Sequence, residues 1–169
     1  MRTHFWILIT LVLGMAASTV VAGPAPIYKA INLGTLGGHH TDGSAVNASG
    51  QVTGESTVGT VPAGGSGAFH PYLFSDGVMK DLGTLGGDGG VGLAINSSGQ
   101  VVGQTALPSG DQVPFLYSNG TLMNLGTFGG ASGSAQAINS SGQVTGEARP
   151  PAQDSLDRIT PSCTATAVW

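Results

Sequence analysis

Short stretches in which apolar and polar residues alternate recur along most of the chain, separated by turns rich in glycine. Alternation over about four to eight residues is typical of half-buried β-strands, and Asn and Gly favour the tight turns between them. One such pattern occurs three times along the chain. In each of these three copies an apolar stretch precedes Asn-x-Ser-Gly, and Gln-Val-x-Gly belongs to the next strand. This pattern predicts paired strands at Ser44–Asn47 and Gln51–Glu55, Leu93–Asn96 and Gln100–Thr105, and Gln136–Asn139 and Gln143–Ala148.

Two more strands follow in the first two copies. They are predicted near Tyr72–Phe74 and Val78–Leu82, and near Phe115–Tyr117 and Thr121–Leu125. The residues between them include Asp-Gly in one copy and Asn-Gly in the other, which are strong signals for a two-residue hairpin turn. Each copy therefore reads as an antiparallel meander of four short strands.

The copies form a tandem repeat. The segment Leu33–Gly54 recurs 49 residues later as Leu82–Gly103 and a further 43 residues later as Leu125–Gly146, with twelve of its 22 columns identical throughout. Four strands with this period match one blade of a β-propeller. We therefore expect an all-β fold of tandem four-stranded antiparallel meanders, propeller-like and either partial or three-bladed. The predicted units span about 33–81, 82–124 and 125–169.

The ends of the array leave two architectures open. Ile27–Leu33 resembles the fourth strand of a preceding unit, and Ala165–Trp169 resembles a third strand, so the two ends could complete one unit and close a ring. The alternative is an open meander, truncated from a longer array, whose exposed strand edges would favour self-association. Residues 149–163 depart from the repeat and fit neither architecture in particular.

The N-terminus has the features of an export signal. Arg2 precedes the apolar run Phe5–Ala17, and Val20 and Ala22 stand where a signal peptidase reads small residues before Gly23. We predict a signal peptide over 1–22 and a secreted β-repeat domain over 23–169, extracellular or periplasmic. The alternative is an uncleaved anchor helix. After cleavage the sequence predicts no membrane partner.

Charge and composition narrow the partners. Only 8% of the residues are charged while 29 are glycine, and after cleavage four basic residues oppose nine acidic ones, a net charge of −5. Without a basic patch, a nucleic-acid partner is not expected. Cys163 is the single cysteine, so no disulfide can form within the chain.

The repeat itself carries a family resemblance. Leu-Gly-Thr-Leu-Gly-Gly, followed by Ala-Ile-Asn-x-Ser-Gly-Gln-Val-Val-Gly, resembles the bacterial extracellular repeat known as the HAF repeat. The third strand is similar to a degenerate form of that family's His-Ala-Phe-Leu-Trp motif, as in Gly67-Ala68-Phe69-His70. The resemblance implies an exported bacterial protein with propeller-like repeats, and it implies no particular activity.

Polar residues that recur in every unit, such as the Asn and Gln flanking each turn, are expected to serve turns and bonds between units. Residues that differ between units are better candidates for a binding site. They are predicted to gather on one variable face, where the segment between units and the loop after the second strand emerge together. These candidate ligand-binding residues are His39, His40, Asp42, Asp88 and Asp111.

Polar residues that differ between units, and two glutamates that share a column, could support several chemistries. His39-His40-x-Asp42 could supply metal ligands, but a metal site needs three or four convergent groups, so no metal site and no cofactor are predicted. Asp88 lies in a glycine-rich loop that lacks the nine-residue period of calcium-binding repeats. Glu55 and Glu147 share a column, and a carboxylate pair can hydrolyse glycosides. These two lie on different units, and ordinary strand-end positions are the favoured explanation.

No catalytic constellation is evident, so the sequence favours a non-catalytic secreted repeat protein. Its expected role is surface binding, adhesion or structure, with an extracellular glycan or protein as ligand. One alternative is a secreted hydrolase or carbohydrate-binding module. The other is a fragment of a longer repeat array.

Overall fold

The computed structural model describes residues 28–59 and 67–149. The chain divides into two compact units, Met1–Ile31 and Asn32–Trp169, and every strand described below belongs to the second. The signal peptide predicted over 1–22, Cys163 and the strand predicted at Ala165–Trp169 lie outside the described residues. None of the described residues lies in a helix with the length and apolar character needed to cross a membrane.

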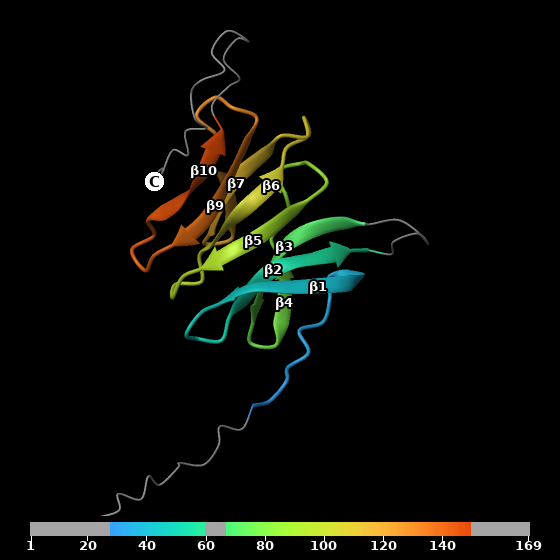
Figure 1. The fold of residues 1–169 in the computed structure, drawn as a ribbon. Coiled ribbons are helices and arrows are strands. Elements are labelled where there is room, and N and C mark those ends of the chain that lie inside the picture. Colours follow the sequence, from blue (N-terminus) through green and yellow to red (C-terminus); the bar gives the residue numbers. More distant parts are fainter. Residues whose placement is uncertain (1–27, 60–66, 150–169) are drawn as a thin grey trace, which may run out of the picture. The chain divides into compact units, whose positions relative to one another are not determined.

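The first repeat forms a four-stranded antiparallel sheet (Figure 1). Its strands are β1 (Gly37–Val46), β2 (Val52–Val58), β3 (Ala68–Ser75) and β4 (Val78–Asp81), and they pair in chain order. The predicted meander is confirmed for this repeat. By contrast, Tyr28–Leu33 carries no strand, so the strand predicted at Ile27–Leu33 is not found where the structure describes it.

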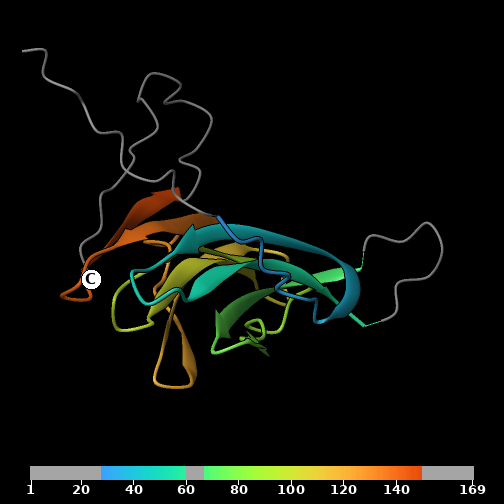
Figure 2. The same cartoon turned by 90° about the horizontal axis from the view of Figure 1, so that it is seen from below.

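The second and third repeats share a six-stranded sheet. The strands are β5 (Gly90–Ile95), β6 (Val101–Ala106), β7 (Gln112–Ser118), β8 (Thr121–Asn124), β9 (Ser132–Ile138) and β10 (Val144–Arg149). Pairing within each repeat is again antiparallel, while a parallel pair, Gln112 with Ser132, joins β7 to β9. The β3–β4 turn (green) and the β7–β8 turn (gold) project to the same side, so the first two repeats have the same orientation (Figure 2).

The turn residues behave as their chemistry predicts. Asn47 Oδ1 accepts hydrogen bonds from the backbone N–H groups of Ser49 and Gln51, both at 3.0 Å. Asn96 and Asn139 accept the equivalent bonds in their own repeats. The repeated Asn-x-Ser-Gly segment is therefore a turn that is stabilised by its own first side chain.

The short hairpins are also confirmed. Asp76 and Gly77 have φ angles of 54° and 79°, and Asn119 and Gly120 have φ angles of 51° and 86°. Two successive residues at positive φ form the turn whose twist matches a two-residue β-hairpin. Asp-Gly and Asn-Gly occupy these positions because both residue types tolerate that conformation.

A register shift in the first hairpin recurs in every repeat. In the first repeat Ser44 is an extra residue in β1 between two paired positions, which is the arrangement of a β-bulge. The glycine opposite the bulge, Gly54, lets β1 approach closely, because a Cβ there would lie 1.9 Å from the carbonyl oxygen of Asp42. The corresponding extra residues are Leu93 and Gln136, and their glycines are equally crowded.

Successive repeats pack through apolar clusters and a chain of amide bonds. One apolar cluster joins the first and second repeats, and another joins the second and third. The first contains Leu73, Leu82, Val101, Phe115 and Tyr117, and the second contains Val102, Leu116, Ala135, Ile138 and Val144. Asn47 Nδ2 donates to the carbonyl of Asn96 at 2.9 Å, and Asn96 Nδ2 donates to that of Asn139 at 3.1 Å. The expectation that the repeated Asn bonds across units is confirmed.

Candidate functional site

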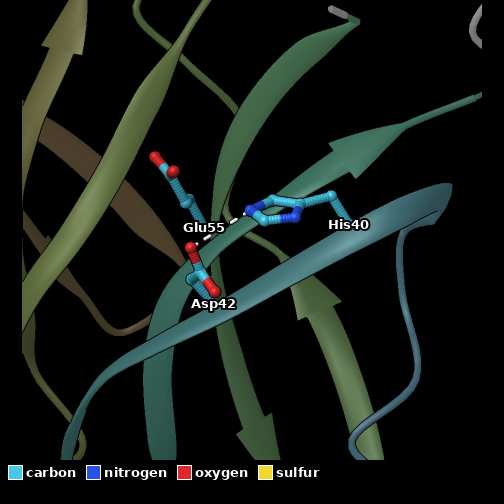
Figure 3. A group of neighbouring side chains, drawn as sticks. All are labelled: His40, Asp42 and Glu55. Carbon is cyan, nitrogen blue, oxygen red and sulfur yellow. Dashed lines mark hydrogen bonds and ion pairs between the residues drawn. The ribbon is translucent and has the colours of Figure 1, made fainter.

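The structure brings three side chains of the first repeat together. His40 and Asp42 on β1 and Glu55 on β2 each offer a nitrogen or carboxylate oxygen, and these atoms all lie within 4.8 Å of one another. Figure 3 shows the His40 imidazole directed at Asp42, with Glu55 beside them, and His40 Nε2 lies 3.1 Å from Asp42 Oδ2. We refer to these residues as the His–carboxylate cluster.

The bulge in β1 decides which residues meet in this cluster. Beyond the bulge, Asp42 pairs with Glu55 and Thr41 with Ser56. Residues directly opposite in an antiparallel pair project to the same face of the sheet, about 4.5–5.5 Å apart at Cβ. The two carboxylates are therefore neighbours because β1 contains one more residue than its partner strand.

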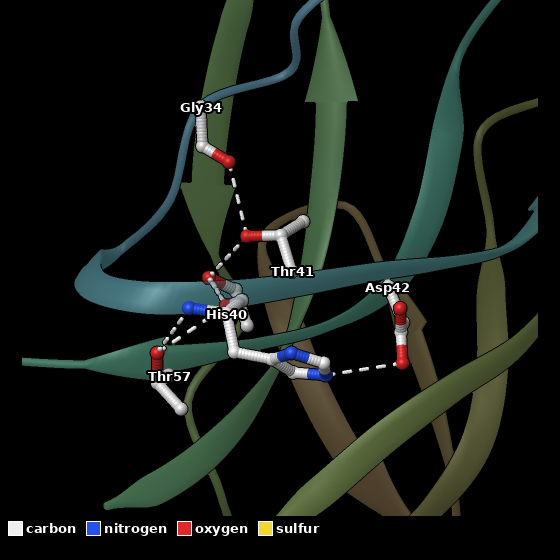
Figure 4. Close-up of polar contacts among 6 residues, drawn as sticks. Gly34, His40, Thr41, Asp42 and Thr57 are labelled. Atoms are coloured by element: carbon white, nitrogen blue, oxygen red, sulfur yellow. Dashed lines mark hydrogen bonds and ion pairs between the residues drawn. The ribbon is translucent and has the colours of Figure 1, made fainter.

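Hydroxyl groups on β2 hold the backbone of His40 (Figure 4). The His40 N–H donates to Thr57 Oγ1 at 3.1 Å, and the His40 carbonyl accepts from Ser56 Oγ at 3.1 Å. The imidazole also makes an edge-to-face contact with Phe69, with ring centroids 5.7 Å apart. These contacts orient the ring while leaving its side chain 47% exposed, so the cluster is open to solvent.

The surroundings of Glu55 change the pKa of its carboxyl. Burial raises the pKa of the Glu55 carboxyl above its ordinary value, the Asp42 carboxylate raises it further, and His40 opposes both effects. Burial and a like charge both disfavour the ionised form, whereas a nearby cation favours it. The cluster is thus a partly desolvated, acidic position that would gain from positive charge.

A buried hydroxyl lies on strand β3 of the same repeat. Tyr72 is fully buried, and among the described residues its hydroxyl oxygen has no hydrogen-bond partner. Burial raises the pKa of the Tyr72 phenol, and the Asp42 carboxylate adds to that effect. The second repeat has Phe115 at this position, which packs in the core without a polar atom.

The other predicted site residues do not join the cluster. His39 lies on β1, Asp88 in the segment before β5, and Asp111 in the β6–β7 loop. The expectation that His39, His40 and Asp42 occupy a loop is wrong, because pairing with β2 extends β1 back to Gly37. Thr41 and Asp42 pair with β2, and the Ser56 and Thr57 hydroxyls bond the His40 backbone, where the glycine-rich sequence indicates a connection.

In the second repeat, the segment between units and the loop after the second strand lie together, as predicted. Gly87 N–H donates to the Ala106 carbonyl at 3.0 Å, which joins the segment before β5 to the end of β6. Asp88 lines a pocket of about 520 Å³ between these two connections. Asp111 lies in the β6–β7 loop, where its carboxylate contacts Ser109 Oγ at 2.8 Å.

Glu147 takes a different place from Glu55. It lies on β10 and lines a separate pocket with Gln104 and Arg149. Glu55 instead faces Asp42 on the neighbouring strand. The pairing of Glu55 with Glu147 considered from the sequence thus gives way to a pair formed within one hairpin.

The sequence points to His40 and Asp42 as site residues, but it does not point to Glu55 as their neighbour. Asp42 and Glu55 flank the same turn, so counting outward from Asn-x-Ser-Gly would have placed them nearly opposite. Only a one-residue bulge makes the match complete. The sequence therefore shows that Asp42 and Glu55 flank one turn, but it does not show the strand register that places them directly opposite.

Comparisons with protein-family models, with curated proteins and with solved structures found no match to this chain.

Proposed function

We propose that this chain is an exported, non-catalytic β-repeat protein that binds a ligand at a surface, in an adhesive or structural role. The proposal includes an HAF-type, propeller-like array and an extracellular or periplasmic location. Its principal support is that the repeated polar side chains and the polar side chains of the His–carboxylate cluster have different roles. Those that repeat serve turns and bonds between repeats, whereas within residues 28–59 and 67–149 such a cluster occurs only in the first repeat.

The second repeat indicates that the scaffold does not need the cluster. At the positions of His40, Asp42 and Glu55 it has Gly89, Val91 and Gln104, and it forms the same hairpin with the same bulge. Polar groups that the fold does not require, exposed on a rigid sheet, are suited to recognition.

A glycan microarray and a panel of chromogenic glycosides test the proposal on the purified, exported chain. We expect saturable binding to the array without turnover of the glycosides, and weaker binding by Asp42→Asn. The matched control is Asp76→Asn, which removes an acid in the β3–β4 turn, outside the cluster, and should bind as the wild type does. Absence of saturable binding both to the array and to intact bacterial cells would overturn the proposal.

One observation favours a second candidate, a secreted glycoside hydrolase. Asp42 and Glu55 lie about as close as the two carboxyl groups of retaining enzymes, which are roughly 5–5.5 Å apart. The raised pKa of Glu55 would suit a general acid, and the Asp42 side chain is placed where a retaining enzyme has its nucleophile. Turnover of any glycoside that is lost in Glu55→Gln and retained in Glu147→Gln would favour the hydrolase. Turnover unchanged in Glu55→Gln would exclude this pair as its catalytic residues.

A further inference from the structure

We propose that His40, Asp42 and Glu55 form a binding site for a divalent transition-metal ion such as Zn²⁺. The site deepens the proposed function, because a bound ion would present an open coordination position to a ligand. Metal binding itself can be measured with the ion alone, so its failure is distinguishable from failure of surface binding.

The donor atoms suit such an ion. One imidazole nitrogen and two carboxylates are typical ligands of Zn²⁺ and related ions, whereas Ca²⁺ prefers six to eight oxygen ligands. With ligand bonds of about 2.0–2.1 Å, tetrahedral geometry places the ligand atoms roughly 3.3–3.4 Å apart. His40 Nε2 and Asp42 Oδ2 are already 3.1 Å apart, and every donor lies within 4.8 Å of the others. A small rotation of the Glu55 side chain would close the set.

The strands hold the backbone of all three ligands in place. Asp42 and Glu55 are a directly opposed pair fixed by the register of β1 and β2. His40 is held through its backbone by Ser56 and Thr57. Ligands on paired strands lose less conformational freedom on binding than ligands on loops, which favours affinity.

The electrostatics also favour a cation. Two carboxylates within 4.8 Å of one another repel. A divalent ion placed between them would replace this repulsion with attraction to both. Three protein ligands leave a fourth position for water or for an oxygen of a bound partner, as in open zinc sites.

The other repeats provide built-in comparisons. The second repeat has Gly89, Val91 and Gln104 at these positions, and therefore lacks the donors. The third has Ser132, Ser134 and Glu147. Since all three repeats make the same bulged hairpin, the ligand set is an addition to the scaffold.

Isothermal titration calorimetry of the exported chain, purified without a histidine tag, tests the site with Zn²⁺. We expect one ion per chain. His40→Ala, Asp42→Asn and Glu55→Gln should each lower the affinity at least about tenfold, since loss of even an outer-shell partner costs about 10–100-fold. Asp76→Asn in the β3–β4 turn and Glu147→Gln on β10 are matched controls that keep the ligand set and should bind as the wild type does.

A second readout guards against variants that fail to fold. Co²⁺ in place of Zn²⁺ should give visible absorption bands in the wild type and in both controls, and weaker bands in the three ligand variants. Circular dichroism should show the same β content in all of them. The proposal is overturned if the wild type binds no Zn²⁺, or if a folded Asp42→Asn or Glu55→Gln variant binds it with unchanged affinity.

Discussion

The first and second repeats share one scaffold and differ in what it carries. Both form a four-stranded meander, with the same bulge and the same Asn-anchored turn. The first adds the His–carboxylate cluster and the buried Tyr72 hydroxyl, where the second has Gly, Val, Gln and Phe. The difference shows that residues required by the backbone geometry of the bulge and the turn recur in both repeats, whereas residues that this geometry does not require differ between them.

The largest expected effect tests the shared scaffold. An alanine Cβ at Gly54 or Gly103 would lie 1.9 Å from the carbonyl oxygen of Asp42 or Val91. Backbone cannot move aside as a side chain can, so we expect Gly54→Ala and Gly103→Ala each to destabilise by about 3 kcal/mol or more. Urea unfolding would measure both. A cost in only one repeat would show that the bulges are not equivalent.

A smaller effect should distinguish the two repeats at their interface. A Cβ at Gly92 would lie 2.1 Å from Thr53 Oγ1, which is buried and bonded to the Tyr72 carbonyl. At the equivalent Gly43 the nearest atom is 3.5 Å away. We expect Gly92→Ala to cost about 1–3 kcal/mol and Gly43→Ala less than about 0.5 kcal/mol, measured by thermal unfolding. Equal costs would mean that the first two repeats do not approach as closely as described.

The amide bonds between repeats can be measured by a paired substitution. Both Asn96→Ala and Asn139→Ala remove the turn bonds and a contact with the following Gln, but only Asn96→Ala also removes the bond to the Asn139 carbonyl. We expect Asn96→Ala to be the more destabilising by about 1 kcal/mol, the usual net value of a hydrogen bond. If the two variants unfold at the same urea concentration, the bond between repeats contributes nothing measurable.

The buried hydroxyl offers an exchange between the repeats. Tyr72→Phe removes a buried polar atom with no partner among the described residues and copies Phe115, so we expect stabilisation by up to about 1 kcal/mol. The reverse change, Phe115→Tyr, should destabilise by about 1–3 kcal/mol. Thermal melts of both variants would check the pair. Destabilisation by Tyr72→Phe would show that the hydroxyl is bonded in solution.

The smallest expected effect concerns the charge of Glu55. Its pKa is raised in the folded state, so its contribution to stability is fully present at acid pH, below the unfolded pKa, and is lost as the pH rises through the folded pKa. Glu55→Gln, which copies Gln104, should therefore melt higher than the wild type at neutral pH without metal. The difference should vanish below the ordinary pKa range of glutamate. A constant difference across this window would argue against an ionised, strained Glu55.

Most of the strands and turns could be predicted from the sequence. Alternation places a strand over each of the ten segments, and turns at Asn47, Asp76 and Asn119 adopt the conformations that their residues favour. These features are local, because turn chemistry and side-chain alternation depend on residues within a few positions. The candidate site is harder to predict from the sequence than the strands and turns are. His40 and Asp42 were named, but Glu55 was assigned to a different pair.

What the sequence by itself determined is the repeating unit, its turns and the positions that vary. Only the tertiary structure decided the full length of β1, the bulge at Ser44 and the meeting of Asp42 with Glu55. The physical reason is that register belongs to a pair of strands. A shift of one residue exchanges the faces of every side chain beyond it, and only the packed sheet selects among the alternatives.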